Sequence, residues 1–456
     1  MKNFINSLEG KKIHFVGVGG ISVSGLALYA LDKKAVVSGS DSVRSEATDR
    51  LKNLGVEVNI GHKRSNLKND VQLVVYTSAV REDNPELKKA IELNIPTVKR
   101  SQFLGSILEA YRDSVAISGC HGKTTATAML SQILLEDEKT PTIFLGGEYG
   151  EYKNYRLGSG SYVVAEACEY KKNFLDLKAR ISVVLNIDND HLDSYKDLSD
   201  TIGTFKSFVS ESLAVVNADD INCKNVFHSS TVTFGIENLA TYMAKSIKFN
   251  GKGYTFTACA YGRRYGKINL SIIGRHNIYN ALAAFAVADV LGVSFGAVKR
   301  ALEKFSGVKR RNEYLGELFG LPCYADYAHH PNELRATLSA FKETMGEALV
   351  VFQPHTYSRT RLLMADFVSV LKEFEDVIIY ETYAARENYD QSGSATALCE
   401  NVIGAGGKGV EYAETEDELL KKLKTALKGK SAIIFLGAGD IYDIAKSVLG
   451  KYLQVS

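Results

Sequence analysis

The feature that most constrains the fold of this chain is a glycine-containing loop between an apolar run and an amphipathic run. Val115-Ala116-Ile117 predicts a buried strand, and Gly119-Cys120-His121-Gly122-Lys123-Thr124-Thr125 follows it. The next run has apolar residues at 126, 129, 130, 133 and 134, which is the spacing of a core-facing helix. Backbone N–H groups and the dipole at such a helix start are suited to phosphates. The sequence therefore predicts an α/β unit that binds a nucleotide at residues 119–125.

The loop is shorter than the usual phosphate loop. Its spacing is G-x-x-G-K-T, and Ile117 stands where G-x-x-x-x-G-K-[ST] would have its first glycine. Lys123 can supply a positive charge to phosphates, and the Thr124 hydroxyl can hold Mg²⁺. The residues alone leave open a plain strand-to-helix turn with incidental glycines.

The first part of the chain alternates apolar runs with helical stretches. Strands are predicted at 13–16, 35–37 and 72–76, with a helix at 21–31 after the first. This alternation predicts a parallel, doubly wound sheet whose ligands lie at the carboxyl ends of its strands. Gly17-x-Gly19-x-x-Ser22, with Asp41 further on, imitates a dinucleotide fingerprint but lacks its third glycine. It predicts phosphate binding, with nicotinamide binding as the weaker alternative.

Further along, apolar strands end at Glu166 and before Asn186, and residues 230–273 predict antiparallel strands. A helix is predicted at 280–291. From about residue 313 the alternation resumes, with strands that end at Asp326, Gln353, Glu381 and Gly437. We expect three domains, 1–110, 111–312 and 313–456.

Two side chains after central strands can bind a metal. Glu166 and His191 should lie at the same sheet edge as the glycine loop, where a carboxylate and an imidazole could hold a metal that carries phosphates. The nearby aspartates Asp190 and Asp193 could instead cap or solvate the loop. The cationic residues after the C-terminal strands indicate an anionic ligand, although each alone could be a surface residue.

The composition excludes several classes of function. The chain has 55 Lys and Arg against 53 Asp and Glu, and this balance gives no reason to expect a nucleic acid or an anionic membrane as partner. No window approaches 18 consecutive apolar residues, and the first ten residues do not resemble a signal peptide. The six cysteines are scattered without a C-x-x-C pair, which favours free thiols. We expect a cytoplasmic protein without integral membrane association.

Taken together, the segments resemble the Mur ligases, the ATP-dependent amide-forming enzymes of peptidoglycan synthesis. The resemblance covers essentially the whole chain and is closest to the branch that adds L-alanine to UDP-N-acetylmuramate. It is carried by Ile13-His14-Phe15-Val16-Gly17-Val18-Gly19-Gly20, Gly119 to Thr125, Asp326-Tyr327-Ala328-His329-His330-Pro331, Phe352-Gln353-Pro354-His355 and Tyr383-Ala384-Ala385-Arg386-Glu387.

The resemblance implies a fold and a reaction. The fold would be a Rossmann-like UDP-binding domain, a central ATPase-type α/β domain and a C-terminal Rossmann-like domain. In the reaction, ATP would phosphorylate the lactyl carboxylate, and L-alanine would attack the acyl phosphate to give an amide, ADP and phosphate. The cofactors would be ATP and Mg²⁺, the partners UDP-N-acetylmuramate and L-alanine, and the protein a monomer or homodimer.

The resemblance also implies roles for single residues. The ATP site would comprise Gly119, Cys120, His121, Gly122, Lys123, Thr124, Thr125, His276, Asn277, Asn280, Arg311 and Asp326. The sugar-nucleotide site would comprise Gly17, Gly19, Gly20, Ser40, Asp41 and Ser78. The metal would lie on Thr124, Glu166 and His191, and the catalytic residues would be Lys123, Glu166, His191, His330 and Arg359. Arg359 would hold the alanine carboxylate; His330 could assist it or serve as a packing or hinge residue.

Four positions depart from the family pattern, namely Ser22, Cys120, Cys168 and Ala325. A cysteine inside an anion-binding loop at a helix start predicts a lowered thiol pKa, hence alkylation that ATP would prevent. We also expect Lys123 to be exposed, so that its removal would leave stability unchanged. The alternatives are a relative that adds another amino acid or a peptide, a nicotinamide-dependent dehydrogenase, and a non-catalytic nucleotide-binding protein.

Overall fold

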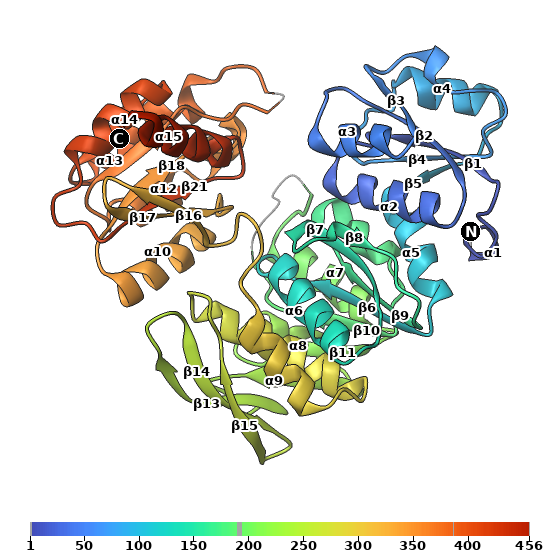
Figure 1. The fold of residues 1–456 in the computed structure, drawn as a ribbon, viewed down its shortest axis with the longest axis horizontal. Coiled ribbons are helices and arrows are strands. Elements are labelled where there is room, and N and C mark those ends of the chain that lie inside the picture. The colour runs from blue at the N-terminus through green and yellow to red at the C-terminus, as the bar shows by residue number, and fades with distance from the viewer. Residues whose placement is uncertain (1, 189–193, 386, 456) are drawn as a thin grey trace. The chain divides into compact units, whose positions relative to one another are not determined.

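The computed structural model describes residues 2–188, 194–385 and 387–455, and the chain divides into two compact units (Figure 1). The first unit contains residues 1–248, 255–270 and 277–305, and the second contains 249–254, 271–276 and 306–456. Three sheets, each with parallel strand pairs, make the protein an α/β protein, as the alternation of apolar and helical runs predicted. Among the described residues, none of the helices is both long and apolar enough to cross a membrane.

The N-terminal part of the first unit is a parallel five-stranded sheet in the order β3-β2-β1-β4-β5. Its strands are β1 (Lys12–Val16), β2 (Val36–Asp41), β3 (Glu57–Ile60), β4 (Leu73–Tyr76) and β5 (Thr97–Lys99). Its helices are α1 (Lys2–Ile5), α2 (Ile21–Asp32), α3 (Glu46–Asn53), α4 (Pro85–Glu92) and α5 (Arg100–Ala110). The glycine loop 17–20 joins β1 to α2 at the carboxyl edge, so the first predicted strand, turn and helix are confirmed.

The larger sheet has ten strands in the order β15-β14-β13-β12-β11-β10-β6-β9-β7-β8. Its strands are β6 (Asp113–Ser118), β7 (Thr142–Tyr149), β8 (Lys153–Arg156), β9 (Tyr162–Glu166), β10 (Ile181–Val184), β11 (Leu213–Asn217), β12 (Thr231–Gly235), β13 (Tyr242–Phe249), β14 (Tyr254–Ala260) and β15 (Arg263–Asn269). The helices in this stretch are α6 (Lys123–Glu136), α7 (Leu198–Val209), α8 (His276–Val290) and α9 (Phe295–Lys304).

The prediction of antiparallel strands over 230–273 is confirmed for β14 and β15 and wrong for β12. β14 and β15 pair antiparallel around the turn at Tyr261-Gly262. β12, however, runs parallel to β11 and to β13, which corrects the prediction for that strand. β12 follows a crossover that contains a 3₁₀ turn, and a crossover returns the chain in the same direction. The glycine spacing gave no information on direction.

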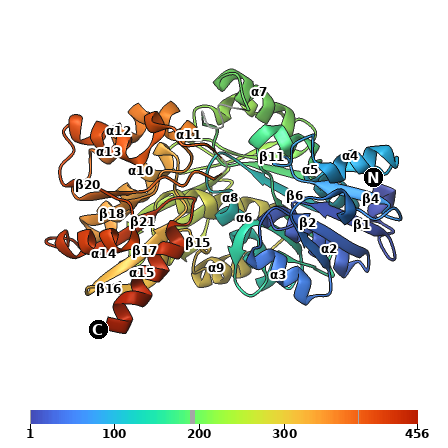
Figure 2. The same ribbon diagram turned by 90° about the horizontal axis from the view of Figure 1, so that it is seen from above.

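The second unit carries a six-stranded sheet in the order β16-β17-β21-β18-β19-β20, with only β16 antiparallel to its neighbour. Its strands are β16 (Glu313–Leu318), β17 (Leu321–Asp326), β18 (Ala348–Phe352), β19 (Val377–Tyr380), β20 (Val410–Ala413) and β21 (Ala432–Leu436). Its helices are α10 (Pro331–Met345), α11 (Tyr357–Leu362), α12 (Met364–Leu371), α13 (Ala395–Gly404), α14 (Glu416–Thr425) and α15 (Ile441–Val455). Figure 2 shows α15 beside β16, β17 and β21, which it contacts.

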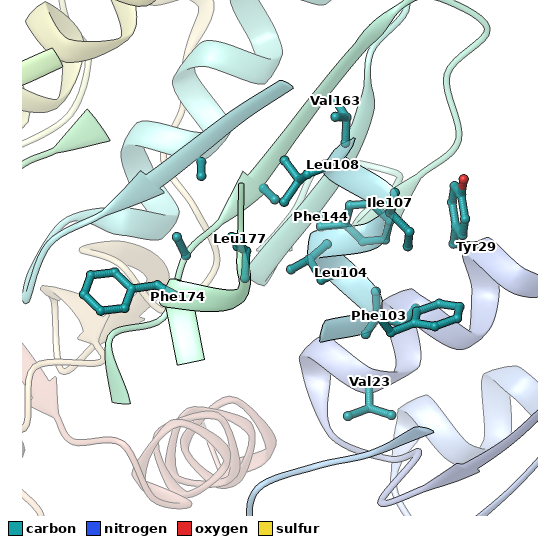
Figure 3. Close-up of a cluster of buried hydrophobic side chains, with 14 of the residues drawn as sticks. Val23, Tyr29, Phe103, Leu104, Ile107, Leu108, Phe144, Val163, Phe174 and Leu177 are labelled. Atoms are coloured by element: carbon teal, nitrogen blue, oxygen red, sulfur yellow. The ribbon is translucent and has the colours of Figure 1, made fainter. Parts of the chain in front are cut away.

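Buried apolar side chains hold each unit together. In the second unit, Val350 and Phe352 belong to one cluster and Leu349 and Val351 to another. Because alternate residues of a strand point to opposite faces, both faces of this sheet are covered. In the first unit, a single cluster joins α2 and α5 to the central sheet; Figure 3 shows Phe103, Leu104, Phe144 and Phe174 within it. α2 therefore packs against β7 and β8 as well as on its own sheet.

Candidate functional site

The polar loops that the sequence analysis singled out meet at the carboxyl edge of the ten-stranded sheet. β10, β6 and β9 are consecutive neighbours and run parallel. β6 leads into the loop at Gly119, β9 ends at Glu166, and Asn186 follows β10. The fold thus places Glu166 at the same sheet edge as the glycine loop, as the sequence predicted.

Two glycines give the loop its shape. Gly122 is the N-cap of α6 with φ of +83°, and a Cβ there would lie 2.6 Å from Oδ1 of Asn280. Gly119 has φ of +143°, and a Cβ there would lie 3.0 Å from Cβ of Leu185. Asn280 in turn donates from Nδ2 to Oδ1 of Asn277 at 3.0 Å. Two predicted ATP residues, Asn277 and Asn280, therefore lie beside the loop.

The loop is braced by the segment that follows β10. Asn186 accepts a hydrogen bond from the backbone N–H of His121 at 2.8 Å and donates one from Nδ2 to the His121 carbonyl at 3.0 Å. The His121 ring lies 3.3 Å from a carboxylate oxygen of Asp188. Asn186 and Asp188 received no role from the sequence, although their position directly after a strand end was a usable signal.

Lys123 is not the exposed side chain that the sequence analysis expected. Its ammonium group donates to the carbonyl oxygens of Gly119 at 2.6 Å and Cys120 at 3.0 Å, and it pairs with Glu169 at 3.0 Å. The side chains of Lys123 and Glu169 are only 13% and 2% exposed. Burial by itself would lower the pKa of Lys123, but the surrounding acidic groups, Glu169 first among them, together outweigh it and hold the pKa above its usual value. Glu169 is a site residue to which the sequence analysis assigned no role.

Thr124 and Glu166 form a hard-oxygen pair next to the loop. The Thr124 hydroxyl donates to Oε2 of Glu166 at 2.8 Å, and the backbone N–H of Gly146 donates to the same oxygen at 2.8 Å. A hydroxyl and a carboxylate beside a phosphate loop are the donors that Mg²⁺ prefers, so these residues fit the expected cation. His191, the third predicted ligand, lies outside the described residues.

The thiol of Cys120, which the sequence predicted to be reactive, is buried. The residue is 7% exposed, and its sulfur accepts a hydrogen bond from the backbone N–H of Asp188 at 3.2 Å. The neighbouring Thr125 is also buried, at 7% exposure. Because an alkylating reagent must reach the sulfur, this packing opposes the predicted alkylation.

The predicted sugar-nucleotide residues lie around the turn from β1 into α2. Gly17 has φ of +84° and donates its N–H to the Ser40 carbonyl at 2.8 Å. Gly19 donates to the Asp41 carboxylate at 2.8 Å, and a Cβ on Gly19 would lie 3.0 Å from that carboxylate. Gly20 is the N-cap of α2. The turn thus contains Gly17, Gly19 and Gly20 and is held to Asp41 at the end of β2.

Ser40 and Ser78 face different surroundings. The Ser40 hydroxyl is fully buried, donates to Glu86 at 2.6 Å and lies 3.1 Å from the His62 ring, so it is directed into the domain interior. The Ser78 hydroxyl lies 3.4 Å from the amide nitrogen of Asn173 of the central part. Of these two predicted residues, only the Ser40 hydroxyl is engaged inside the N-terminal sheet domain.

Asp326 and Arg311 lie together in the second unit. The buried Asp326 carboxylate accepts hydrogen bonds from the backbone N–H groups of Asn312 at 2.7 Å and Ala328 at 2.8 Å. Burial raises its pKa, and the nearby Arg311 acts in the opposite direction. The Arg311 guanidinium lies over the Tyr327 ring, 5.1 Å from its centroid.

His276, His330 and Arg359 also belong to the second unit. His276 lies against Gly274, where a Cβ would come within 2.8 Å of its Nδ1. His330 is 5% exposed and is the N-cap of α10, with Nδ1 accepting from the Asn332 N–H at 3.4 Å. His330 thus makes a structural contact of its own, besides the role predicted for it beside Arg359. Arg359 is half-buried on α11, with Nη1 3.4 Å from Nδ1 of His355. Burial, followed by the charges of His329 and Arg359, lowers the pKa of His355 to about 4, so this ring is a neutral acceptor at pH 7.

Comparison with known families covers all three sheets. Residues 12–112 match the model described as "Mur ligase family, catalytic domain". Residues 117–288 match "Mur ligase middle domain", and residues 310–439 match "Mur ligase, glutamate ligase domain".

Individual relatives match over the full length. A protein of Clostridium beijerinckii named UDP-N-acetylmuramate–L-alanine ligase is 40% identical over 99% of this chain and 99% of its own length. A protein of the same name from Clostridium novyi is 41% identical over 98% of this chain and 99% of its own.

Two crystal structures have the same fold. The UDP-N-acetylmuramate-alanine ligase of Thermotoga maritima superposes with a TM-score of 0.83 and 30% identity, covering 98% of this chain and 100% of that one. A murein peptide ligase of Psychrobacter arcticus has a TM-score of 0.72 at 23% identity, covering 97% of this chain and 98% of that one, and at that identity it supports the fold alone. With three consecutive family matches and full-length relatives at about 40% identity, this chain belongs to the Mur ligase family.

Proposed function

We propose that this protein joins L-alanine to the lactyl carboxylate of UDP-N-acetylmuramate, with ATP converted to ADP and phosphate, as a step in making a peptidoglycan precursor. The observation that carries the proposal is the phosphate loop of 119–125 beside the Thr124–Glu166 pair, in a chain whose full-length relatives are named for that reaction. The loop supplies the phosphate chemistry, and the relatives' names supply the substrates.

The proposed ATP site lies at the start of α6. Lys123 would move its ammonium group from the Gly119 and Cys120 carbonyls to the β- and γ-phosphates. His121, Gly122 and Thr125 would complete the loop. Asn277 and Asn280 would lie on the adenosine side. We propose ATP contacts also for His276, Arg311 and Asp326. Phosphoryl transfer between two anions needs positioning and charge neutralisation, and Lys123 provides both.

The proposed cation site rests on Thr124 and Glu166. When bound, Mg²⁺ would neutralise phosphate charge and polarise the γ-phosphate. Thr124 and Glu166 would hold it with one hydroxyl and one carboxylate oxygen, and His191 would add a nitrogen ligand. Glu169 keeps Lys123 protonated and aimed across the loop, which is a positioning task rather than a bond to substrate.

The sugar nucleotide would bind at the β1–α2 turn. The N–H groups of residues 17–20 and the start of α2 suit a diphosphate, and Asp41 suits sugar hydroxyls. Ser78 would contact the ligand from the end of β4. Ser40 would contribute through its backbone, because its hydroxyl is bound to Glu86.

The acceptor amino acid would bind in the second unit. We propose that Arg359 holds the alanine carboxylate with two parallel hydrogen bonds. Within the described chain, the Arg359 guanidinium has no carboxylate partner, so its charge is available to a ligand. His330 would assist by fixing the start of α10. We further propose domains 1–110, 111–312 and 313–456, a cytoplasmic location because ATP and nucleotide sugars are made there, and a monomer or homodimer.

One assay tests this proposal. Phosphate release would be followed with UDP-N-acetylmuramate, ATP and Mg²⁺ while the acceptor is varied over single amino acids and a tripeptide, with the product identified by mass. L-Alanine should be preferred, with glycine and serine as poorer substrates, because one methyl group contributes only about 1–3 kcal/mol. Clear preference for the tripeptide or for another amino acid would overturn the assignment.

A further inference from the structure

A pocket of about 180 Å³ lies in the first unit, beside the start of α2 and the end of β9. It is lined by Ser22 at the start of α2, Arg100 and Leu104 of α5, Phe144 of β7, Glu166 at the end of β9, and Cys168. Leu104 and Phe144 belong to the buried cluster drawn in Figure 3 and form its apolar wall. The pocket thus connects the proposed sugar-nucleotide turn with the proposed cation ligand Glu166.

Arg100 is the cationic group of this pocket. It is half-buried at the first position of α5, and its Nη1 donates to the Ser22 hydroxyl at 3.0 Å. In residues 2–188, 194–385 and 387–455, no carboxylate pairs with this guanidinium. A guanidinium has five N–H donors, so most of them remain for a ligand. A half-buried cation that lacks a protein counter-ion favours an anionic group in the pocket.

We propose that Arg100 binds the lactyl carboxylate of the sugar nucleotide and holds it beside Glu166 for phosphorylation; this inference rests on the proposed function. The nucleotide end of the substrate would lie on the turn 17–20, which ends two residues before Ser22. Its acid end would then reach the pocket, where Thr124 and Glu166 mark the place of phosphoryl transfer. The carboxylate of the other proposed substrate, alanine, is not part of the molecule that would bind at the β1–α2 turn.

The chemical step balances without a proton transfer. A carboxylate oxygen attacks the γ-phosphorus, the new P–O bond forms as the bond to the bridging oxygen of ADP breaks, and ADP leaves with the electron pair. Two parallel N–H bonds from Arg100 fix the direction of the attacking carboxylate and afterwards hold its carbonyl oxygen. Arg100 is therefore assigned a catalytic contact, while Ser22 orients the guanidinium.

Two residues that depart from the family pattern, Ser22 and Cys168, line the same pocket. Glycine at 22 would remove the acceptor that holds Nη1 of Arg100. Cys168 brings a thiol and no carboxylate to the wall, and the Glu166 carboxylate is engaged by Thr124 and the Gly146 N–H. This composition favours a carboxylate that arrives with the substrate.

The test compares two ligands that differ in the lactyl group. Binding of UDP-N-acetylmuramate and UDP-N-acetylglucosamine would be measured by calorimetry for the wild type, Arg100→Lys and Arg100→Gln. The variants should bind UDP-N-acetylmuramate about tenfold or more weakly, because a charge-assisted bidentate contact is lost. Binding of UDP-N-acetylglucosamine should change less than twofold. Arg50→Lys is the matched control, since Arg50 donates to Asn154 at 3.3 Å in the same part of the unit.

Kinetics and melting complete the test. The KM for UDP-N-acetylmuramate should rise and kcat should fall in both Arg100 variants, whereas the KM for ATP and the melting temperature stay near wild type. Ser22→Ala should raise the same KM by a smaller factor. If the Arg100 variants bound both sugar nucleotides equally more weakly, or both as tightly as the wild type, the proposed role of Arg100 would be wrong. Failure of the wild type to ligate UDP-N-acetylmuramate would instead refute the proposed function, so the two failures are distinguishable.

Discussion

At the scale of single residues, burial changes what Lys123 and Cys120 do. The Lys123 side chain is 13% exposed and pairs with the Glu169 side chain, which is 2% exposed, so it has a structural role besides its proposed phosphate contact. A thiol that is 7% exposed is shielded even though it lies in an anion-binding loop. Three predictions belong to this scale.

Lys123→Ala should lower kcat by about 10²- to 10³-fold or more, because the charge on the transferred phosphate loses its partner. It should also lower the free energy of unfolding by about 3–5 kcal/mol, because the buried Glu169 carboxylate loses its lysine partner. Denaturant unfolding and steady-state kinetics measure both effects. The double variant Lys123→Ala/Glu169→Gln should recover stability but not activity; recovery of neither would show that the pair is not the source of the loss.

Cysteine labelling of the folded protein should reach Cys168 and Cys259 before Cys120, because the first two are half-exposed. Peptide mass spectrometry after a time course of iodoacetamide treatment gives the order. Cys120→Thr should keep wild-type turnover, since a hydroxyl can also accept from the Asp188 N–H. Rapid loss of activity that tracks Cys120 labelling would restore the reactive-thiol interpretation.

Arg359→Lys should raise the KM for alanine strongly while the KM values for ATP and UDP-N-acetylmuramate stay unchanged. Lysine keeps the charge but cannot make two parallel hydrogen bonds to a carboxylate. Alanine dependence at saturating ATP and sugar nucleotide measures the effect. Arg361→Lys is the control, because Arg361 pairs with Asp390 at 2.6 Å on the surface; equal effects in the two variants would contradict the assignment.

At the scale of elements, a buried polar network holds the N-terminal sheet domain together around Glu86. Its carboxylate accepts from Ser40 of β2 at 2.6 Å and Asn66 at 2.8 Å and lies 2.9 Å from the His14 ring of β1. Burial alone would raise the pKa of Glu86, but these hydrogen bonds lower it below its usual 4.5. One carboxylate thus links α4, two strands and the loop after β3.

A carboxyl group whose pKa is lower in the folded than in the unfolded protein stabilises the folded state at pH values above its unfolded pKa, which is near 4.5 for Glu86. That stabilisation is lost as the pH falls through the pKa of the folded state. Glu86→Gln should therefore lower the melting temperature at pH 7, and the gap to wild type should narrow below about pH 4.5. Melting curves from pH 7 to pH 3 measure this. Glu92→Gln, on the exposed surface of the same helix, should show a far smaller effect; a pH-independent gap for Glu86→Gln would contradict the linkage.

At the scale of the whole molecule, the buried cluster in Figure 3 ties the N-terminal sheet domain to the central sheet. Phe103 of α5 packs edge-on against Phe15 of β1 at 5.8 Å, and Leu104 and Phe144 continue the cluster to β7. The second unit has separate apolar clusters of its own. We therefore expect each of the two units to unfold as one cooperative body, instead of three separate transitions for the three segments matched by family models.

Calorimetry should therefore show two transitions, one for the first unit and one for the second. Phe103→Ala should destabilise the first by about 3–5 kcal/mol, through lost burial and a cavity, and leave the second in place. Phe341→Ala, a fully buried position of the second unit, should do the reverse. A single transition that both variants shift equally would contradict the division.

Local chemistry explains which features the sequence alone determined. Strand and helix periods, the positive-φ glycines and the run of polar residues after each apolar strand predict the α/β class, the phosphate loop and its proximity to Glu166. The contacts that Glu169 and Asn186 make with the loop were not predicted, because these two residues reach it from separate elements. The direction of β12, the burial of Lys123 and Cys120, and the pocket at Arg100 were likewise decided by tertiary packing. Burial and pairing depend on which distant side chains arrive at the same place, and no local sequence pattern specifies that.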